Sequence, residues 1–117
     1  MGADENTIFH KIMRREVPAE ILHEDEQIVV IRDINPVSPT HLLIIPKKTI
    51  PSMEDVGAAD EQLLGHMLVV AAELAKKQGI SESGYRLVIN TGLQGQQTVY
   101  QLHLHLIGGR QFGWPPG

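Results

Sequence analysis

The chain of 117 residues is long enough for one compact domain and leaves no room for a second. It has no cysteine, which excludes disulfides and thiolate chemistry and restricts any zinc site to histidines and carboxylates. The formal net charge is −4 and the basic residues are scattered, so the sequence lacks the basic stripe that binds a nucleic-acid polymer. A mononucleotide is still compatible, because backbone N–H groups can hold one phosphate.

Two features indicate where the protein is found. Asp4 and Glu5 stand where a secretory signal peptide would carry basic and then apolar residues. The longest apolar stretch, from Met67 to Ala75, is interrupted by Glu73 and is too short to span a bilayer. We therefore expect a cytoplasmic protein with no membrane partner.

One helix and two strands are predicted in the N-terminal third. Thr7 is a suitable N-cap for a helix that ends before Pro18, and its apolar residues recur at helical spacing (Ile8, Phe9, Ile12 and Met13). Strands are predicted from Glu20 to His23 and from Gln27 to Arg32, joined by an acidic turn.

A loop, a strand and a long helix are predicted in the middle of the chain. Two prolines in residues 33–39 fix the backbone and stop strand pairing. The run from His41 to Ile45 is apolar and β-branched enough for a buried strand, which Pro46 closes. The long helix is predicted to start near residues 58–60 and to stop at Gly79.

The last two strands are predicted from Tyr85 to Ile89 and from Val99 to Ile107, on either side of a loop rich in Gly and Gln (residues 90–98). The order is therefore a helix, three strands, a helix, two strands and a tail. Strands that cluster along the chain can pair as antiparallel neighbours, so we predict one α+β domain over residues 1–117.

The last predicted strand carries the candidate chemistry. Alternate side chains of a strand share a face, so Gln101, His103 and His105 are expected to point one way. The residues expected to face the core are Tyr100, Leu102, Leu104 and Leu106. The loop before this row can turn N–H donors toward an anion, and such donors beside a nucleophilic imidazole suit phosphoryl or nucleotidyl transfer.

Two other interpretations of the row stay open on the residues alone. His103 and His105 could bind one zinc ion, with His41 as a third ligand, or they could lie on a solvated sheet face without a role. The remaining histidines have no companions in the sequence and are interpreted as surface or helix-face residues without function (His10, His23 and His66).

Short motifs extend from Thr7 to the last residue: Thr7-Ile8-Phe9, Arg32-Asp33-Ile34-Asn35-Pro36, Pro39-Thr40-His41, Ile45-Pro46-Lys47-Lys48, Gly84-Tyr85-Arg86, Val88-Ile89-Asn90, Gln97-Thr98-Val99-Tyr100, Gly108-Gly109-Arg110-Gln111 and Trp114-Pro115-Pro116-Gly117. In this order, and without a large insertion, they resemble the histidine triad (HIT) family, most closely its Hint branch of purine nucleoside phosphoramidases. The resemblance implies an antiparallel sheet of about five strands with one long and one short helix, continued across a homodimer.

The resemblance also implies catalytic roles. His103 would attack the α-phosphorus of adenosine 5′-phosphoramidate, or of a lysyl- or aminoacyl-adenylate, and form a nucleotidyl-histidine that water then hydrolyses. His105 would bind the phosphate and help proton transfer to the leaving amine, and His41 would support this network. No cofactor and no metal ion are expected.

The implied nucleotide pocket has three parts, and its substrate is a purine nucleoside monophosphate derivative. Asp33 would accept both ribose hydroxyls, and Trp114 would reach toward the active site of the other subunit. The implied phosphate contacts are Asn90, Gln97, Thr98 and the backbone N–H of Val99. The residues implied to sandwich the purine are Ile8, Phe9, Ile12, Ile31 and Ile34.

Two positions depart from the family pattern. Gln101 stands where the first histidine of His-x-His-x-His is expected, and Gln cannot hold a charge. Gln96 stands where close relatives have glycine, so that a side chain could narrow the pocket or a positive φ could be required. The alternative hypothesis is therefore a nucleotide-binding module with little turnover. Chemistry on dinucleoside polyphosphates is a third hypothesis, but the Trp-Pro-Pro-Gly ending favours the phosphoramidase branch.

Overall fold

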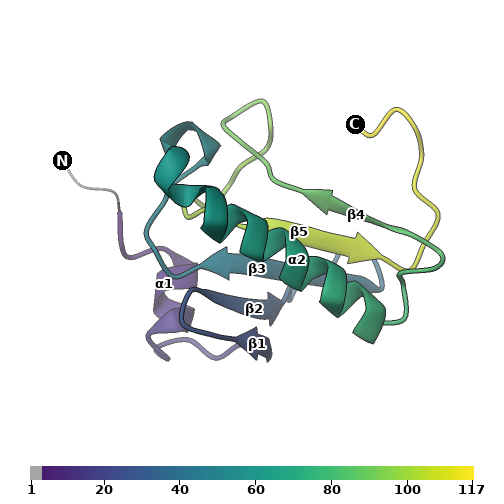
Figure 1. Ribbon diagram of the computed structural model, residues 1–117, viewed down its shortest axis with the longest axis horizontal. Helices are drawn as coiled ribbons and strands as arrows, with labels where there is room; N and C mark the ends of the chain where they lie inside the picture. The colour runs from purple at the N-terminus through teal and green to yellow at the C-terminus, as the bar shows by residue number, and fades with distance from the viewer. Residues whose placement is uncertain (1–3) are drawn as a thin grey trace.

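The computed structural model describes residues 4–117. Its elements in chain order are α1 (Ile8–Met13), β1 (Ile21–Glu24), β2 (Ile28–Arg32), β3 (Thr40–Pro46), the short 3-10 helices η1 (Met53–Asp55) and η2 (Ala58–Asp60), α2 (Glu61–Lys77), β4 (Tyr85–Val88) and β5 (Leu104–Gly108). The strands form one antiparallel sheet in the order β1-β2-β3-β5-β4 (Figure 1). The predicted α+β class, with one long and one short helix, is confirmed. Within the described residues, no helix has the length and apolar character to cross a membrane.

The long helix α2 covers one face of the sheet, where it runs across β3 and β5 (Figure 1). Strand side chains alternate between the two faces, and on β3 it is Leu42 and Ile44 that pack against the helix. The helix contributes residues at helical spacing to this core, including Met67, Ala71 and Leu74. Full burial of each large aliphatic side chain stabilises the fold by about 1.5–3 kcal/mol, so this layer is the main core.

The opposite face of the sheet is only partly covered. Phe9 and Ile12 of α1 pack on the other set of alternating strand residues, among them Ile31 and Leu43. A six-residue helix covers little of a sheet, and within residues 4–117 no second helix lies over the part of this face near β5. The histidines lie in this part of the sheet, where Phe9 of α1 contacts the ring of His103.

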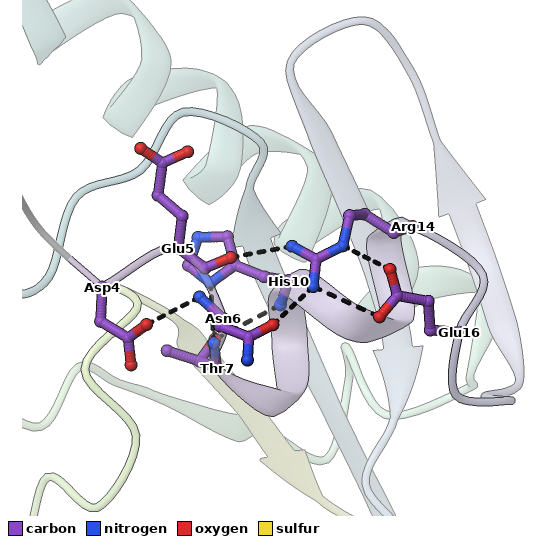
Figure 2. Close-up of polar contacts among 7 residues, drawn as sticks. All are labelled: Asp4, Glu5, Asn6, Thr7, His10, Arg14 and Glu16. Carbon is purple, nitrogen blue, oxygen red and sulfur yellow. Dashed lines mark hydrogen bonds and ion pairs between the residues drawn. The ribbon is translucent and has the colours of Figure 1, made fainter.

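The α1 helix is held at its N-terminus by polar contacts (Figure 2). The Thr7 hydroxyl accepts a hydrogen bond from the backbone N–H of His10, whose ring lies 2.8 Å from that hydroxyl. The other ring nitrogen lies 3.2 Å from Thr49 Oγ1, and Arg14 donates to Asn6 and Glu16. The prediction that His10 lacks companions is therefore wrong, because its ring closes a capping box and meets a distant loop.

The last strand is shorter than predicted. It begins at Leu104 rather than Val99, because residues 99–103 run beside the segment that follows β3 and bond to it through Leu102 N–H and Ile50 O at 2.7 Å. Leu102, Leu104 and Leu106 are buried, as predicted. Tyr100 is 45% exposed, so its predicted core position is wrong. The strand alternation on which that prediction depends does not extend to residue 100.

Candidate active site

A cavity of about 450 Å³ opens on the sheet face opposite α2. Its volume lies within the usual range for small-molecule sites. The predicted site residues that line it are Ile8, Phe9, Ile12, Ile31, Asp33, Ile34, His41, Thr98, Val99, His103 and His105. The structure thus brings together one apolar wall, from α1 and β2, and one polar wall, from β3 and β5.

The ring of His103 presents an unprotonated nitrogen to the cavity. Its Nδ1 lies 2.7 Å from the backbone oxygen of Gln101, and a carbonyl oxygen only accepts hydrogen bonds, so Nδ1 carries the proton. The lone pair is then on Nε2. Burial lowers the pKa of His103, opposed by the bond to the Gln101 carbonyl, and Phe9 packs edge-on against the ring. The imidazole is therefore neutral near pH 7, as a nitrogen nucleophile must be.

The ring of His105 holds an unpaired hydrogen-bond donor beside the same cavity. His41 Nδ1 accepts from Val37 N–H at 3.1 Å, so its proton is on Nε2, which lies 2.9 Å from His105 Nδ1. His105 Nδ1 therefore accepts, and its Nε2 carries the hydrogen. Among the described residues, this Nε2 is the one buried side-chain nitrogen or oxygen without a hydrogen-bond partner. Such a donor suits an oxygen anion of a ligand.

Burial is the main cause of the shifted pKa values in this histidine pair. Burial, together with the nearby His103 and His41, lowers the pKa of His105 to about 4, and the Asp33 carboxylate acts in the opposite direction. Burial also lowers the pKa of His41, where the Asp33 carboxylate acts in the opposite direction. The rings of His103 and His105 are only 4.9 Å apart between centroids. A neutral lone pair and a neutral N–H donor thus stand side by side.

Asp33 and Ile34 form the loop edge of the cavity. One Asp33 oxygen accepts from Asn35 N–H at 2.8 Å and closes the turn, while the other lies 3.4 Å from His41 Nε2. Asp33 therefore has a turn-forming role and also lines the cavity. Ile34 is 87% exposed and Ile8 is 43% exposed, which leaves apolar surface at the mouth for a flat apolar group.

Three predicted residues lie outside the lining of the cavity: Asn90, Gln97 and Trp114. The Gln97 side chain is buried, accepts from Gly92 N–H, and donates to the carbonyl oxygens of Pro51 and Val99. It therefore shapes the loop before His103 through bonds within the protein. Trp114 is 83% exposed in the C-terminal tail.

The two departures from the family pattern have different outcomes. The Gln101 side chain is fully buried and bonds to the backbone of residues 46–50, so the prediction that it shares a polar row with the histidines is wrong. Gln96 adopts φ 64°, so the positive φ considered from the sequence is confirmed. Neither side chain lines the cavity, and neither narrows it.

Part of this site also has the atoms for a metal ion. One ligand atom each from Asp33, His41 and His105 lie within 4.8 Å of one another, whereas His103 is not in this group. However, His41 Nε2 and His105 Nδ1 are already hydrogen-bonded to each other. A zinc ion here would have to replace that bond and change the tautomer of the pair.

Sequence reasoning missed several apolar lining residues, including Val17, Val37 and Leu43. Leu43 stands two residues after His41 on β3 and lies directly opposite His105 on β5, so strand alternation could have found it. Val17 belongs to the segment after α1, for which the sequence has no comparable signal.

This fold and its histidine pair define a class of hydrolases, and the chain belongs to the histidine triad (HIT) family. Residues 6–112 match the family model described as "Scavenger mRNA decapping enzyme C-term binding". The chain is 52% identical to the purine nucleoside phosphoramidase of Escherichia coli (strain K12) over 109 aligned residues. The alignment covers 93% of this chain and 92% of that protein.

Solved structures agree with this assignment. A HIT family hydrolase from Legionella pneumophila Philadelphia 1 superposes with a TM-score of 0.93 at 53% identity, covering 96% of this chain and all of that one (100%). A histidine triad protein from Clostridium difficile gives a TM-score of 0.88 at 34% identity, with 97% of each chain covered. The chain is a hydrolase of this family.

Proposed function

We propose that this hydrolase cleaves the P–N bond of adenosine 5′-phosphoramidates to AMP and an amine, and acts at the same phosphorus of related lysyl- and aminoacyl-adenylates, which carry a P–O bond to the acyl group. The observation that carries this proposal is the pair formed by the His103 Nε2 lone pair and the His105 Nε2–H in one buried cavity. A nucleophile beside a donor for the phosphoryl oxygens is what nucleotidyl transfer to nitrogen requires. The phosphoramidase relative from Escherichia coli supports the same substrate class.

In the first step, His103 Nε2 forms a bond to the α-phosphorus as the bond from phosphorus to the amine breaks. The resulting nucleotidyl-imidazole gains positive charge, which the Gln101 carbonyl stabilises through Nδ1–H. The leaving amine takes a proton from solvent, while His105 keeps its hydrogen and donates a hydrogen bond from Nε2 to a phosphoryl oxygen. In the second step, water attacks phosphorus, His103 leaves as neutral imidazole, and the proton of the water goes to solvent. Atoms and charge balance over the two steps.

The cavity walls support a purine nucleoside as the rest of the substrate. The base would lie between α1 and the exposed Ile34, which has no apolar cover of its own. Asp33 Oδ2, which lies 3.4 Å from His41 Nε2, would accept hydrogen bonds from the ribose hydroxyls, and the backbone N–H of Val99 would face the phosphate. Gln97 would act on the phosphate indirectly, through the shape of its loop.

The alternative is a nucleotide-binding module with little turnover because of Gln101 and Gln96. The geometry favours turnover, since the Gln101 side chain points into the 46–50 loop and only its backbone oxygen meets His103. Any residue at position 101 supplies that oxygen. Gln96 already adopts the positive φ that glycine would provide.

The test is release of AMP from adenosine 5′-phosphoramidate in the presence of a chelator, compared with His103→Ala. We expect chelator-resistant release that disappears in the variant, together with a nucleotidyl adduct on His103 trapped by rapid quench in alkaline denaturant. If neither protein releases AMP but both bind it, the binding-module hypothesis replaces the hydrolytic one. Release that survives in His103→Ala would refute the nucleophile.

We further propose a homodimer in which the sheet continues through β4. This strand is an edge of the sheet, and its Leu87 is 36% exposed. Val69 of α2 and Trp114 of the tail are also exposed apolar residues, at 59% and 83%. Trp114 would then reach the active site of the second subunit. Sedimentation that shows only monomer at micromolar concentration would refute this assembly.

A further inference from the structure

A second cluster of metal-ligating side chains joins the turn after β1 to α2. His23 Nε2 lies 2.8 Å and His66 Nε2 lies 2.7 Å from the same oxygen, Oδ2 of Asp25. The prediction that these two histidines lack companions is therefore wrong. The three ligand atoms all lie within 4.8 Å of one another. Each side chain is about a third exposed, at 32%, 30% and 34% for His23, Asp25 and His66, so an ion has access from solvent.

An irregularity in β1 brings His23 to this cluster. Strand pairing shifts between Ile21 and His23, and His23 then lies opposite Val30, which belongs to the core under α2. Without the shift, His23 would share a face with Ile21, which packs in the core on the other side of the sheet. The cluster therefore lies on the α2 side, separated by the sheet from the cavity of His103.

The carboxylate is oriented independently of the histidines. Its other oxygen, Oδ1 of Asp25, accepts backbone N–H groups from Gln27 at 2.8 Å and Ile28 at 3.0 Å. Such second contacts orient first-shell ligands in metal sites and raise affinity. Within residues 4–117, the hydrogen-bond partners of Asp25 Oδ2 are His23 and His66.

We propose that His23 Nε2, His66 Nε2 and Asp25 Oδ2 bind one Zn²⁺ ion, with water in the remaining position. Two imidazoles and one carboxylate are a common zinc ligand set, with Zn–N and Zn–O bonds of about 2.0–2.2 Å. Tetrahedral bonds of that length separate ligand atoms by roughly 3.3–3.5 Å, so each histidine moves less than about 1 Å from its present position. Each ring keeps one proton, which passes from Nε2 to Nδ1 through solvent.

The test titrates the metal-free full chain with Zn²⁺ against a chromophoric chelator. The matched variants are His23→Gln and His66→Gln, since an amide still donates to Asp25 but is a poor zinc ligand. His105→Gln serves as the control, because it removes one ligand of the group in the active-site cavity. We expect one tight equivalent in the wild type and in His105→Gln, and an affinity loss greater than about tenfold in each of the other two variants.

A ¹⁵N spectrum of the histidine rings separates a zinc site from a metal-free contact between β1 and α2. Addition of Zn²⁺ to the wild type should change the signals of His23 and His66 from Nε2–H to Nδ1–H tautomers and leave His10 unchanged. This readout also decides the question if a glutamine variant fails to fold. No tight equivalent in the wild type, equal affinity in all variants, or loss only in His105→Gln would overturn the proposal.

Discussion

Replacement of Gln101 by methionine isolates the role of an unusual buried amide. Methionine has nearly the same shape, but it leaves three backbone groups without their partner: Ile50 N–H at 3.1 Å and the carbonyl oxygens of Pro46 and Lys48, each at 2.9 Å. Each buried group left unpaired lowers the free energy of unfolding by about 1–3 kcal/mol. Because the structure around the three groups relaxes in part, we expect a total loss of about 3–5 kcal/mol. This is a large fraction of the roughly 5–15 kcal/mol that stabilises a domain.

Urea denaturation at fixed protein concentration measures the effect. With a slope of about 1–3 kcal/mol per M, the midpoint of Gln101→Met should fall by roughly 2 M. Gln62→Met, on the exposed surface of α2, is the control and should leave the midpoint unchanged, since Gln and Met have similar helix propensities. AMP release by the folded fraction should stay close to wild type, because the Gln101 backbone oxygen is retained. A loss below about 1 kcal/mol, or lost turnover in a protein of unchanged stability, would refute this account.

Three further outcomes are expected. Asp33→Asn should raise KM for adenosine 5′-phosphoramidate about 10- to 150-fold and abolish discrimination against its 2′,3′-dideoxy analogue, because hydrogen bonds to a carboxylate contribute about 1.5–3 kcal/mol. A KM within twofold of wild type would contradict the ribose role of Asp33. The pKa of His105 is about 4 in the native state and 6.5 in the unfolded chain, so between these pH values the unfolded chain binds a proton that the native state does not. The free energy of unfolding should therefore rise with pH in that window, by up to about 1.4 kcal/mol per pH unit. Urea titrations at pH 5 and 7 should show this slope reduced in His105→Gln, and an equal slope would count against the buried neutral ring. In Gly108→Ala the new Cβ lies 2.7 Å from Ile80 Cδ1, and the free energy of unfolding should fall by about 1–3 kcal/mol. In Gly65→Ala the new Cβ meets no atom within 4 Å, and the free energy of unfolding should rise by about 0.5–1 kcal/mol. Equal urea midpoints for the two variants would refute the crowding at Gly108.

Regular elements were predictable because their signals are local. The spacing of apolar residues in α2 and the alternation of Leu104, His105 and Leu106 depend only on helix and strand periods. The same alternation failed at Tyr100 and Gln101, where hydrogen bonds to the 46–50 loop override strand geometry. Those bonds join residues about fifty positions apart, and no local pattern records them.

The sequence by itself determined the α+β class, the order of the elements and most residues of the cavity, because periodicity and a specific run of motifs carry that information. Only the tertiary structure decided the chemical state of each histidine. The partners that assign the tautomers are the Val37 N–H for His41, the ring of His41 for His105 and the Gln101 carbonyl for His103. The tertiary structure also decided that His23 and His66 both contact Asp25, because these contacts depend on a shift in strand pairing and on the packing of α2. Hydrogen-bond partners and burial depend on distance in space, and the sequence specifies them only through the complete fold.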